Sequence, residues 1–313
     1  MNYSKRILKT GALAVAMTIV FAIFAFRAAE WTKGLDSEFI VYGQATGGST
    51  GTTGGGTSGG GTTVTKVIPQ IAAGNYGDVE PRKYGTVIEI VNPNSTAITI
   101  SGSLYNENGT SSTLIGTTNL TSVLPTFTGS FNNLPLAANS VLVIEIGTNS
   151  TNTPLVPTTN WGKFTASGAI TVASFFDLRD SGSNLLYSRV GVPASRADMT
   201  TFVIPRIRQA SSGAGIAEID TGFALVNTGS LPAHVTATVK DANGNTVGAQ
   251  KVITLAANAH MSNFVVGLFG LTGEASVRQY QYIKFISDSA SIAAAALAFE
   301  GASQTSFPVD VLQ

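Results

Sequence analysis

The chain contains no cysteine and few charged side chains, and both features exclude particular kinds of site or binding partner. Without cysteine there are no disulfides, thiolate nucleophiles or cysteine-ligated metals. Charged residues make up 12% of the 313 residues, about half the usual share. The 18 basic side chains are balanced by 18 acidic ones. A nucleic-acid binder needs a basic face to displace counterions from phosphates, so this balance argues against that class.

Polarity comes instead from Gly, Thr, Ser and Asn, which suit β-structure with many tight turns. Hydrophobic residues make up 43% of the chain, enough to bury a core, so global disorder is excluded. The missing cysteines are compatible with export, because modules of more than about 100 residues fold without disulfides.

The N-terminus combines a basic start with an apolar run. Lys5, Arg6 and Lys9 precede a neutral, mainly apolar stretch at residues 11–26, a pattern typical of a secretory signal. The stretch is slightly long for a signal core and short for a membrane span of about 20 residues. The sequence therefore predicts export, by a cleaved signal within residues 1–29 or with that segment retained as a membrane anchor. A buried helix of a cytoplasmic fold is the remaining alternative.

Residues 30–63 are predicted to be a linker. From Thr46 to Thr63 every residue is Gly, Ser or Thr, so no apolar side chain is present to fold the segment. A phosphate-binding glycine loop would need a strand before it, a helix after it and usually a lysine, and none of these is present. The segment is therefore read as a flexible tether.

Beyond the linker, five short motifs return in the same order, which indicates one module present twice. The pairs are residues 67–71 and 203–207, 90–93 and 225–228, 105–109 and 240–244, 136–139 and 255–258, and 163–164 and 284–285. The offset is 135 or 136 for the first three pairs and 119 or 121 for the last two. The first copy therefore carries about sixteen extra residues (135 − 119), an insertion at about 110–135. We predict one domain at 64–198 and a second at 199–313.

Local patterns within each copy predict strands. Apolar residues alternate with polar ones around Ile98–Leu104 and again around Ala233–Val239, as in a half-buried antiparallel strand. Each stretch runs into an Asn-Gly pair, the strongest short-range hairpin signal, with positive φ expected at both residues.

Two segments of the second copy differ from this alternating pattern. Ile292–Phe299 is rich in alanine and reads as a helix in isolation, but its position in the repeat matches the β-branched, aromatic segment Ile170–Leu178, so we expect a strand. A short helix is expected around Ser262–Leu271. The predicted fold class is all-β, with two tandem antiparallel β-sandwich domains, Ig-like or jelly-roll-like, after an N-terminal hydrophobic helix and a flexible linker. A single interlocked barrel is the alternative.

The order of motifs resembles a tandem β-sandwich repeat module of exported proteins from environmental bacteria. In the second copy it is carried by residues 223–227, the Asn-Gly hairpin at 241–244, Phe264–Phe269, and Phe299–Gly301 through Phe307-Pro308. The resemblance covers the second copy well and the first loosely, and it is one of spacing rather than of signature residues. Such modules have no established catalytic site, so the resemblance implies none here.

The two histidines, His234 and His260, are predicted to be surface residues. A Ser/His/Asp site requires a histidine oriented by a carboxylate beside a nucleophile. Neither histidine has such a partner nearby in the sequence, and neither position is histidine in the other copy. On these grounds the chain is predicted not to be an enzyme and to need no cofactor.

Two polar turns contain the oxygen ligands that a metal ion would need. Residues 241–245 begin like a calcium loop, but Val252 stands at the twelfth position, where a bidentate glutamate is required. Asp177, Asp180 and Asn184 surround another turn. Ordinary turns explain both, so no metal site is predicted.

Ligand stacking is the one binding role that particular residues suggest. Trp161, Tyr280 and Tyr282 are the candidates, with the two tyrosines on one face of a strand. Glu89 and Glu145 are expected to face solvent, because an inward carboxylate is costly without a partner.

These observations predict an exported structural or adhesive protein of the cell envelope. Expected partners are other envelope proteins, further copies of itself or surface glycans, with no nucleic acid, and with membrane contact through residues 11–26 if the N-terminal segment is uncleaved. The alternative is a carbohydrate-binding or accessory module of an extracellular polymer-degrading system.

Overall fold

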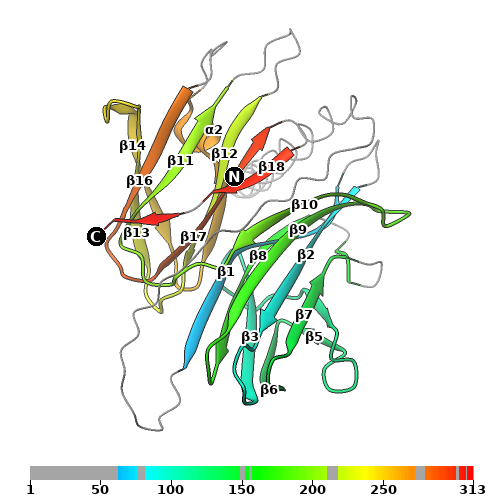
Figure 1. The fold of residues 1–313 in the computed structure, drawn as a ribbon. Coiled ribbons are helices and arrows are strands. Elements are labelled where there is room, and N and C mark those ends of the chain that lie inside the picture. The colour runs from blue at the N-terminus through cyan, green and yellow to red at the C-terminus, as the bar shows by residue number, and fades with distance from the viewer. Residues whose placement is uncertain are drawn as a thin grey trace, which may run out of the picture.

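In the part of the chain that the structure describes, the secondary structure consists of antiparallel strands and one short helix (Figure 1). The structure, a computed structural model, describes residues 63–76, 82–148, 152–154, 157–209, 218–271, 279–300, 303–307 and 309–312. The all-β prediction is confirmed. Within the described ranges no helix is long and apolar enough to cross a membrane. The predicted signal or anchor, and the linker up to residue 62, lie outside them.

Ten strands, drawn blue to green in Figure 1, make up what we call the first strand group. They are β1 (Val64–Tyr76), β2 (Arg82–Val91), β3 (Ile98–Asn106), β4 (Ile115–Thr118), β5 (Thr126–Thr128), β6 (Ser130–Leu136), β7 (Val141–Ile146), β8 (Thr158–Ala166), β9 (Thr171–Asp180) and β10 (Leu186–Pro193). Sheet 1A has the order β6-β3-β8-β1, and sheet 1B has the order β5-β4-β7-β2-β9-β10. The long strand β1 joins the two, because its last residues pair with β2. One apolar cluster draws on both sheets.

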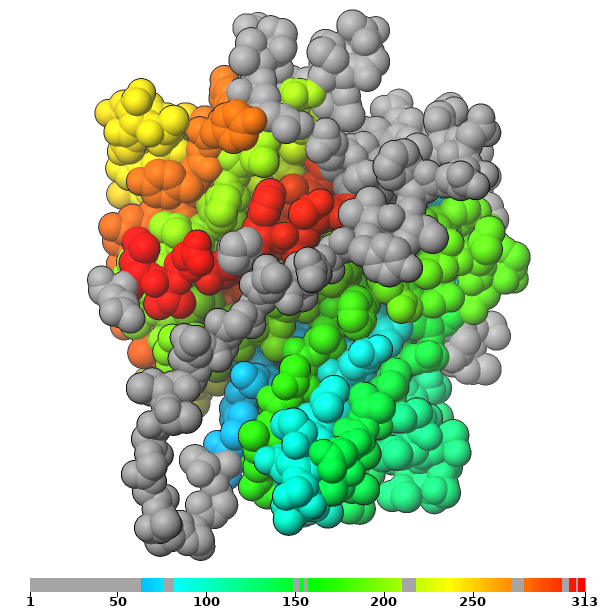
Figure 2. Space-filling view, in the orientation of Figure 1, coloured from blue at the N-terminus to red at the C-terminus, as the bar shows by residue number. Residues whose placement is uncertain are grey.

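The second strand group contains nine strands and a short helix, drawn lime to red (Figure 1 and Figure 2). They are β11 (Thr201–Arg208), β12 (Ile219–Asn227), β13 (Ala233–Lys240), β14 (Thr246–Leu255), β15 (His260–Phe264), α2 (Val265–Phe269), β16 (Gln279–Ser287), β17 (Ile292–Glu300), β18 (Ser303–Phe307) and β19 (Asp310–Val311). Sheet 2A has the order β14-β13-β16-β11-β19, and sheet 2B has the order β15-β12-β17-β18. Helix α2 lies within the segment predicted to be helical, and its Val265 and Phe269 join the second apolar cluster.

The two groups repeat one strand order. The order β6-β3-β8-β1 recurs as β14-β13-β16-β11, and β7-β2-β9-β10 recurs as β15-β12-β17-β18. Strands β4 and β5 have no counterpart and lie within the predicted insertion, where they extend sheet 1B beyond β7. The motif pairs read from the sequence therefore fall on matching strands.

A buried asparagine makes the same hydrogen bonds in both groups. Asn92 donates from Nδ2 to the carbonyls of Thr96, Leu136 and Ala137 at 3.0, 3.2 and 2.8 Å. Asn227 donates to Leu231, Leu255 and Ala256 at 2.7, 3.2 and 3.0 Å. Neither side chain is exposed. Two motifs recognised separately in the sequence, Val-Asn and Leu-Ala-Ala-Asn, thus contact one another in each group.

The Asn-Gly pairs form turns, with one correction to the expected geometry. Gly109 and Gly244 both have φ of +82°, but Asn108 and Asn243 are not in the left-handed region. The Gly244 amide donates to the Asp241 carbonyl at 3.0 Å. This arrangement is a type I turn followed by a left-handed glycine, so only the glycine needs positive φ.

The alanine-rich strand β17 is buried on both faces, which explains its composition. Ala294 and Ala296 lie in the core of the second group, whereas Ala295 and Leu297 pack against Phe176 of the first group. Small side chains let two layers approach the same strand. The strand predicted from the repeat is confirmed, and the helical propensity of alanine is overridden by this packing.

Candidate functional site

The outer face of sheet 2A carries the two tyrosines that the sequence singled out. Tyr280 and Tyr282 alternate with Ile283 and Phe285, which face the core, so both lie on the outer face of β16. Tyr280 is 61% exposed and Tyr282 is partly exposed. Tyr280 lies opposite Ile207 of β11, and Tyr282 lies between Pro205 of β11 and Lys240 of β13.

This surface, which we call the tyrosine face, also carries Val203, Lys284 and the 48% exposed Ile286. It combines flat aromatic rings, partly exposed aliphatic side chains and two lysines on a regular sheet. Such a surface offers van der Waals contact and stacking to a partner, with cationic groups for orientation.

Trp161 does not belong to the tyrosine face, and its expected stacking on a ligand is corrected. The side chain is fully buried between the two strand groups. Its ring stacks on Tyr105 with centroids 4.4 Å apart, and Nε1 donates to the Asn258 carbonyl at 2.9 Å. A ring with no exposed surface has nothing to offer a ligand, so Trp161 packs and orients the contact between the groups.

His260 was predicted to be exposed, and this prediction is wrong. It is 5% exposed and lies in the same contact region, where its backbone amide donates to the Glu107 carbonyl at 2.9 Å. Its Nε2 lies 2.7 Å from Gln70 Oε1, and Nδ1 has no hydrogen-bond partner. Burial lowers the pKa of the imidazole to about 3, because the charged ring loses its hydration. His260 is therefore neutral at physiological pH and acts as a packing residue.

His234 is exposed, as predicted, but it does have a carboxylate partner. Its Nδ1 lies 2.8 Å from Asp288 Oδ2, and its backbone amide donates to Asp288 Oδ1 at 2.8 Å. These hydrogen bonds from His234 lower the pKa of Asp288. The sequence could not show this pair, because the two residues come from different strand ends, 54 positions apart.

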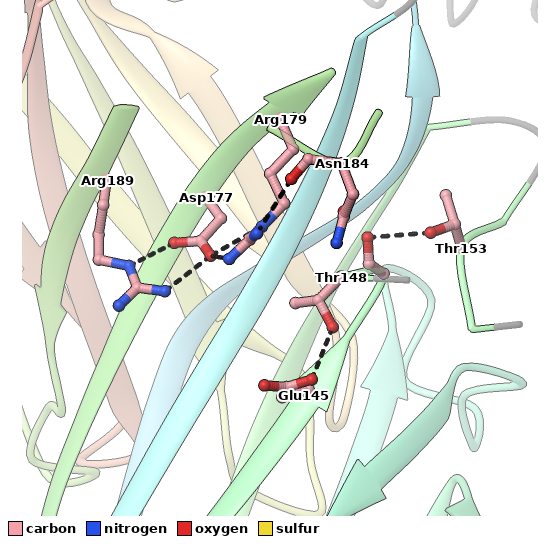
Figure 3. A network of polar contacts seen from close by, with 8 residues as sticks. Glu145, Thr148, Thr153, Asp177, Arg179, Asn184 and Arg189 are labelled. Atoms are coloured by element: carbon pink, nitrogen blue, oxygen red, sulfur yellow. Dashed lines mark hydrogen bonds and ion pairs between the residues drawn. The ribbon is translucent and has the colours of Figure 1, made fainter. Parts of the chain in front are cut away.

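An ion cluster that the sequence did not predict lies on the outer face of sheet 1B (Figure 3). Asp177 on β9 is fully buried beneath two arginines. Arg179 Nη2 approaches Asp177 Oδ2 at 2.5 Å, and Arg189 Nε approaches Oδ1 at 2.6 Å. The hydrogen bond to Asp177 raises the pKa of Arg189, and Glu89 and Glu145 add to the rise. Asp177 is thus held by arginines rather than available to a metal.

A second cluster lies inside the second group and was also missed. Arg206 and Arg208 follow the inward alternation of β11 and pair with Asp220 at 3.3 Å and Glu218 at 3.1 Å. Arg206 Nη1 also bonds to Gln281. Burial raises the pKa of Asp220, and Arg206 opposes that rise. Buried charges of this kind require partners, and an arginine reads as a surface residue in sequence until its partner is known.

The polar turns considered for metal use their carboxylates internally. Asp241 Oδ1 accepts from the amides of Asn243 and Asn245 at 2.9 and 2.8 Å. Asp180 Oδ1 accepts from the amides of Gly182 and Ser183 at 2.9 and 2.6 Å. Among the residues that the structure describes, no group of three His, Cys, Asp or Glu residues is placed to hold a metal.

Glu145 is exposed and Glu89 is partly exposed, as expected. Glu145 accepts from Thr148 Oγ1 at 3.0 Å, on the same side of sheet 1B as Asp177 (Figure 3).

Comparison with known proteins gives no relative for this chain: no family model matches it, and no curated protein or solved structure matches it either.

Proposed function

We propose that this chain is an exported structural or adhesive protein of the cell envelope that works by binding or assembly rather than by catalysis. In this proposal two tandem β-sandwich domains, at 64–198 and 199–313, are displayed outside the membrane behind the linker at 30–63. Residues 1–29 serve as a cleaved signal or as a retained anchor.

The tyrosine face is the observation that carries the proposal. A sheet that covers a core has one face inward, and its outer face is normally polar. Here the outer face of sheet 2A exposes Tyr280 and Ile286 and partly exposes Tyr282 and Val203. Contiguous exposed apolar surface supports a role in association.

Fractionation and protease accessibility test the proposed location and role together. Intact cells that make the full chain should lose the protein to added protease, and the protein should fractionate with the envelope or medium. Protein retained in the cytoplasm and protected from protease would refute the proposed location. Purified protein that binds neither cells, glycans, envelope proteins nor itself would refute the proposed role.

A carbohydrate-binding role is the second candidate, favoured by the spacing of Tyr280 and Tyr282. The two rings lie two residues apart on one exposed strand face, as a stacking platform for sugar rings requires. Binding on a glycan array should be lost in Tyr280→Ala and in Tyr282→Ala. Tyr187→Ala is the matched control, because this exposed tyrosine of β10 already has the Arg82 guanidinium 4.3 Å from its ring centroid. Equal binding by all three variants would rule out the platform.

A further inference from the structure

The contact between the two strand groups joins two different surfaces. The first group contributes Val67 of β1 and Trp161 of β8, with Tyr105 of β3 packed beside them. The second group contributes a row across sheet 2B, in which Val226 lies between His260 and Ala293. We call these the covering surface and the covered row. Val67, Trp161, Val226 and Ala293 are fully buried there.

Because the strand order repeats, the first group has its own version of the covered row. At the matching places of sheet 1B, Val91 lies between Val141 and Thr171. Val91 is 36% exposed and Val141 is 38% exposed, whereas their counterparts Val226 and His260 are buried. The adjoining turn also matches, since Asn139 has φ of 52° and its counterpart Asn258 has φ of 56°. Asn258 is the residue whose carbonyl accepts from Trp161.

The second group likewise has its own version of the covering surface. Val203 corresponds to Val67, because Val203 lies opposite Lys284 and Val67 lies opposite Lys163. Tyr282 corresponds to Trp161, because Tyr282 lies opposite Lys240 and Trp161 lies opposite Tyr105. Val203 and Tyr282 are partly exposed. This free covering surface is the centre of the tyrosine face.

We propose that a second copy of this chain occupies the tyrosine face, with its Val141–Val91–Thr171 row seated on Val203 and Tyr282. The contact would repeat between molecules the packing that already joins the two groups within one molecule. The inference rests on the proposed function, to which it adds the identity of a partner.

Charge supports a second copy as the occupant. The free row is flanked on the same outer face of sheet 1B by Glu89 and Glu145. The tyrosine face carries Lys240 and Lys284, together with one acidic residue, Asp310 of β19, opposite Val203. The covered row inside the molecule has Ala224 and Phe264 at the places that correspond to the two glutamates. Opposite charges thus occur on the two free surfaces but not on the two that are joined within the chain. Assembly is therefore expected to weaken as salt screens these charges.

A contact between two unlike surfaces leaves one of each free after every addition. Head-to-tail contacts of this kind form open chains, or closed rings when the rotation between copies allows closure. The protein would therefore form linear oligomers or rings, in contrast to a symmetric dimer in which each surface meets itself.

Cysteine crosslinking tests this geometry, since the natural chain contains no cysteine. Full-length Val91→Cys/Val203→Cys protein, in mild detergent and oxidised, should give a ladder of disulfide-linked species on a non-reducing gel. An equimolar mixture of Val91→Cys and Val203→Cys should stop at a dimer, and either single variant alone should remain monomeric. Val123→Cys, at a 60% exposed position of the insertion, is the matched control and should not crosslink.

Several outcomes would overturn the inference. Disulfide dimers from Val91→Cys or Val203→Cys alone would indicate a symmetric contact, and monomers in every sample would indicate none. Tyr282→Arg in the double-cysteine background should abolish the ladder, whereas Val123→Arg should leave it intact. Binding of the unsubstituted full chain to cells or glycans is measured in parallel with its oligomeric state. Unsubstituted protein that binds them yet remains monomeric would overturn the head-to-tail contact and leave the proposed function standing.

Discussion

Two glycines in identical turns provide a matched test of the contact between the strand groups. Gly109 and Gly244 share φ of +82°, so replacing either with alanine introduces the same backbone strain, about 1–2 kcal/mol for a left-handed alanine. Their surroundings differ. A Cβ on Gly109 would lie 2.5 Å from the Ala257 carbonyl oxygen and 2.8 Å from the Asn258 carbonyl carbon, whereas a Cβ on Gly244 would meet nothing within 4 Å.

The overlap at Gly109 can be relieved only if its own turn and the turn at residues 256–259 move apart. That turn region carries two hydrogen bonds to the first group, from Trp161 Nε1 to the Asn258 carbonyl and from the His260 amide to the Glu107 carbonyl, both 2.9 Å. At about 1 kcal/mol for each bond, Gly109→Ala should lower the free energy of unfolding by about 2 kcal/mol more than Gly244→Ala does.

Urea unfolding followed by tryptophan fluorescence measures this difference, because Trp161 lies in the contact. A further change should appear in the near-ultraviolet circular dichroism of native Gly109→Ala, since Trp161 stacks on Tyr105 there. Equal destabilisation by the two variants, with unchanged near-ultraviolet spectra, would refute the reasoning that the contact is rigid and well packed.

Three further predictions concern buried polar groups. The pKa of His260 is about 3 in the folded chain and about 6.5 in the unfolded chain. Because the folded pKa is the lower one, the contribution of neutral His260 to stability is complete above about pH 6.5. As the pH falls from there toward 3, the free energy of unfolding declines by about 1.4 kcal/mol per pH unit. His260→Gln should flatten this part of the pH profile of unfolding, and parallel profiles for the two proteins would contradict the assignment. Asp220→Ala leaves the buried Arg206 without its ion partner and should lower the free energy of unfolding by about 3–5 kcal/mol, whereas Asp198→Ala, which breaks an exposed pair with Arg196, should barely move the urea midpoint. Asn92→Ala and Asn227→Ala should each cost about 2–3 kcal/mol, because each leaves buried carbonyls without donors; a large cost at one site and none at the other would show that the two networks are not equivalent.

The sequence predicted the positions of the strands better than it predicted which side chains are exposed. The repeat offsets placed matching strands correctly, including the alanine-rich β17, because alternation and turn residues are local signals. Burial of Trp161 and His260 was missed, since both are covered by the other strand group, and a contact between groups leaves no periodic trace within either strand.

The ion clusters were beyond sequence reasoning for a related reason. Asp177 and Arg189 are twelve residues apart and meet only because β9 and β10 pair in that register. Arg206 and Arg208 continue the inward alternation of β11, and their partners Glu218 and Asp220 lie immediately before and within the start of β12. Alternation along a strand predicts which face of the sheet a side chain occupies, but it does not predict which charged residue will pair with that side chain.

The free strand edges favour association through sheet faces over extension of the sheets. Strand β6, at one edge of sheet 1A, contains Pro135, and its Asn133 has φ of 51°. Strand β14, at the edge of sheet 2A, is bent at Gly248, with φ of 70°, and carries Lys251. At other edges, β5 has three residues and β19 has two. Proline, irregular backbone, lysine and short length all discourage the addition of another strand. Because these four edges are blunted, association is expected through the outer faces of sheets 1B and 2A, which the internal contact leaves uncovered.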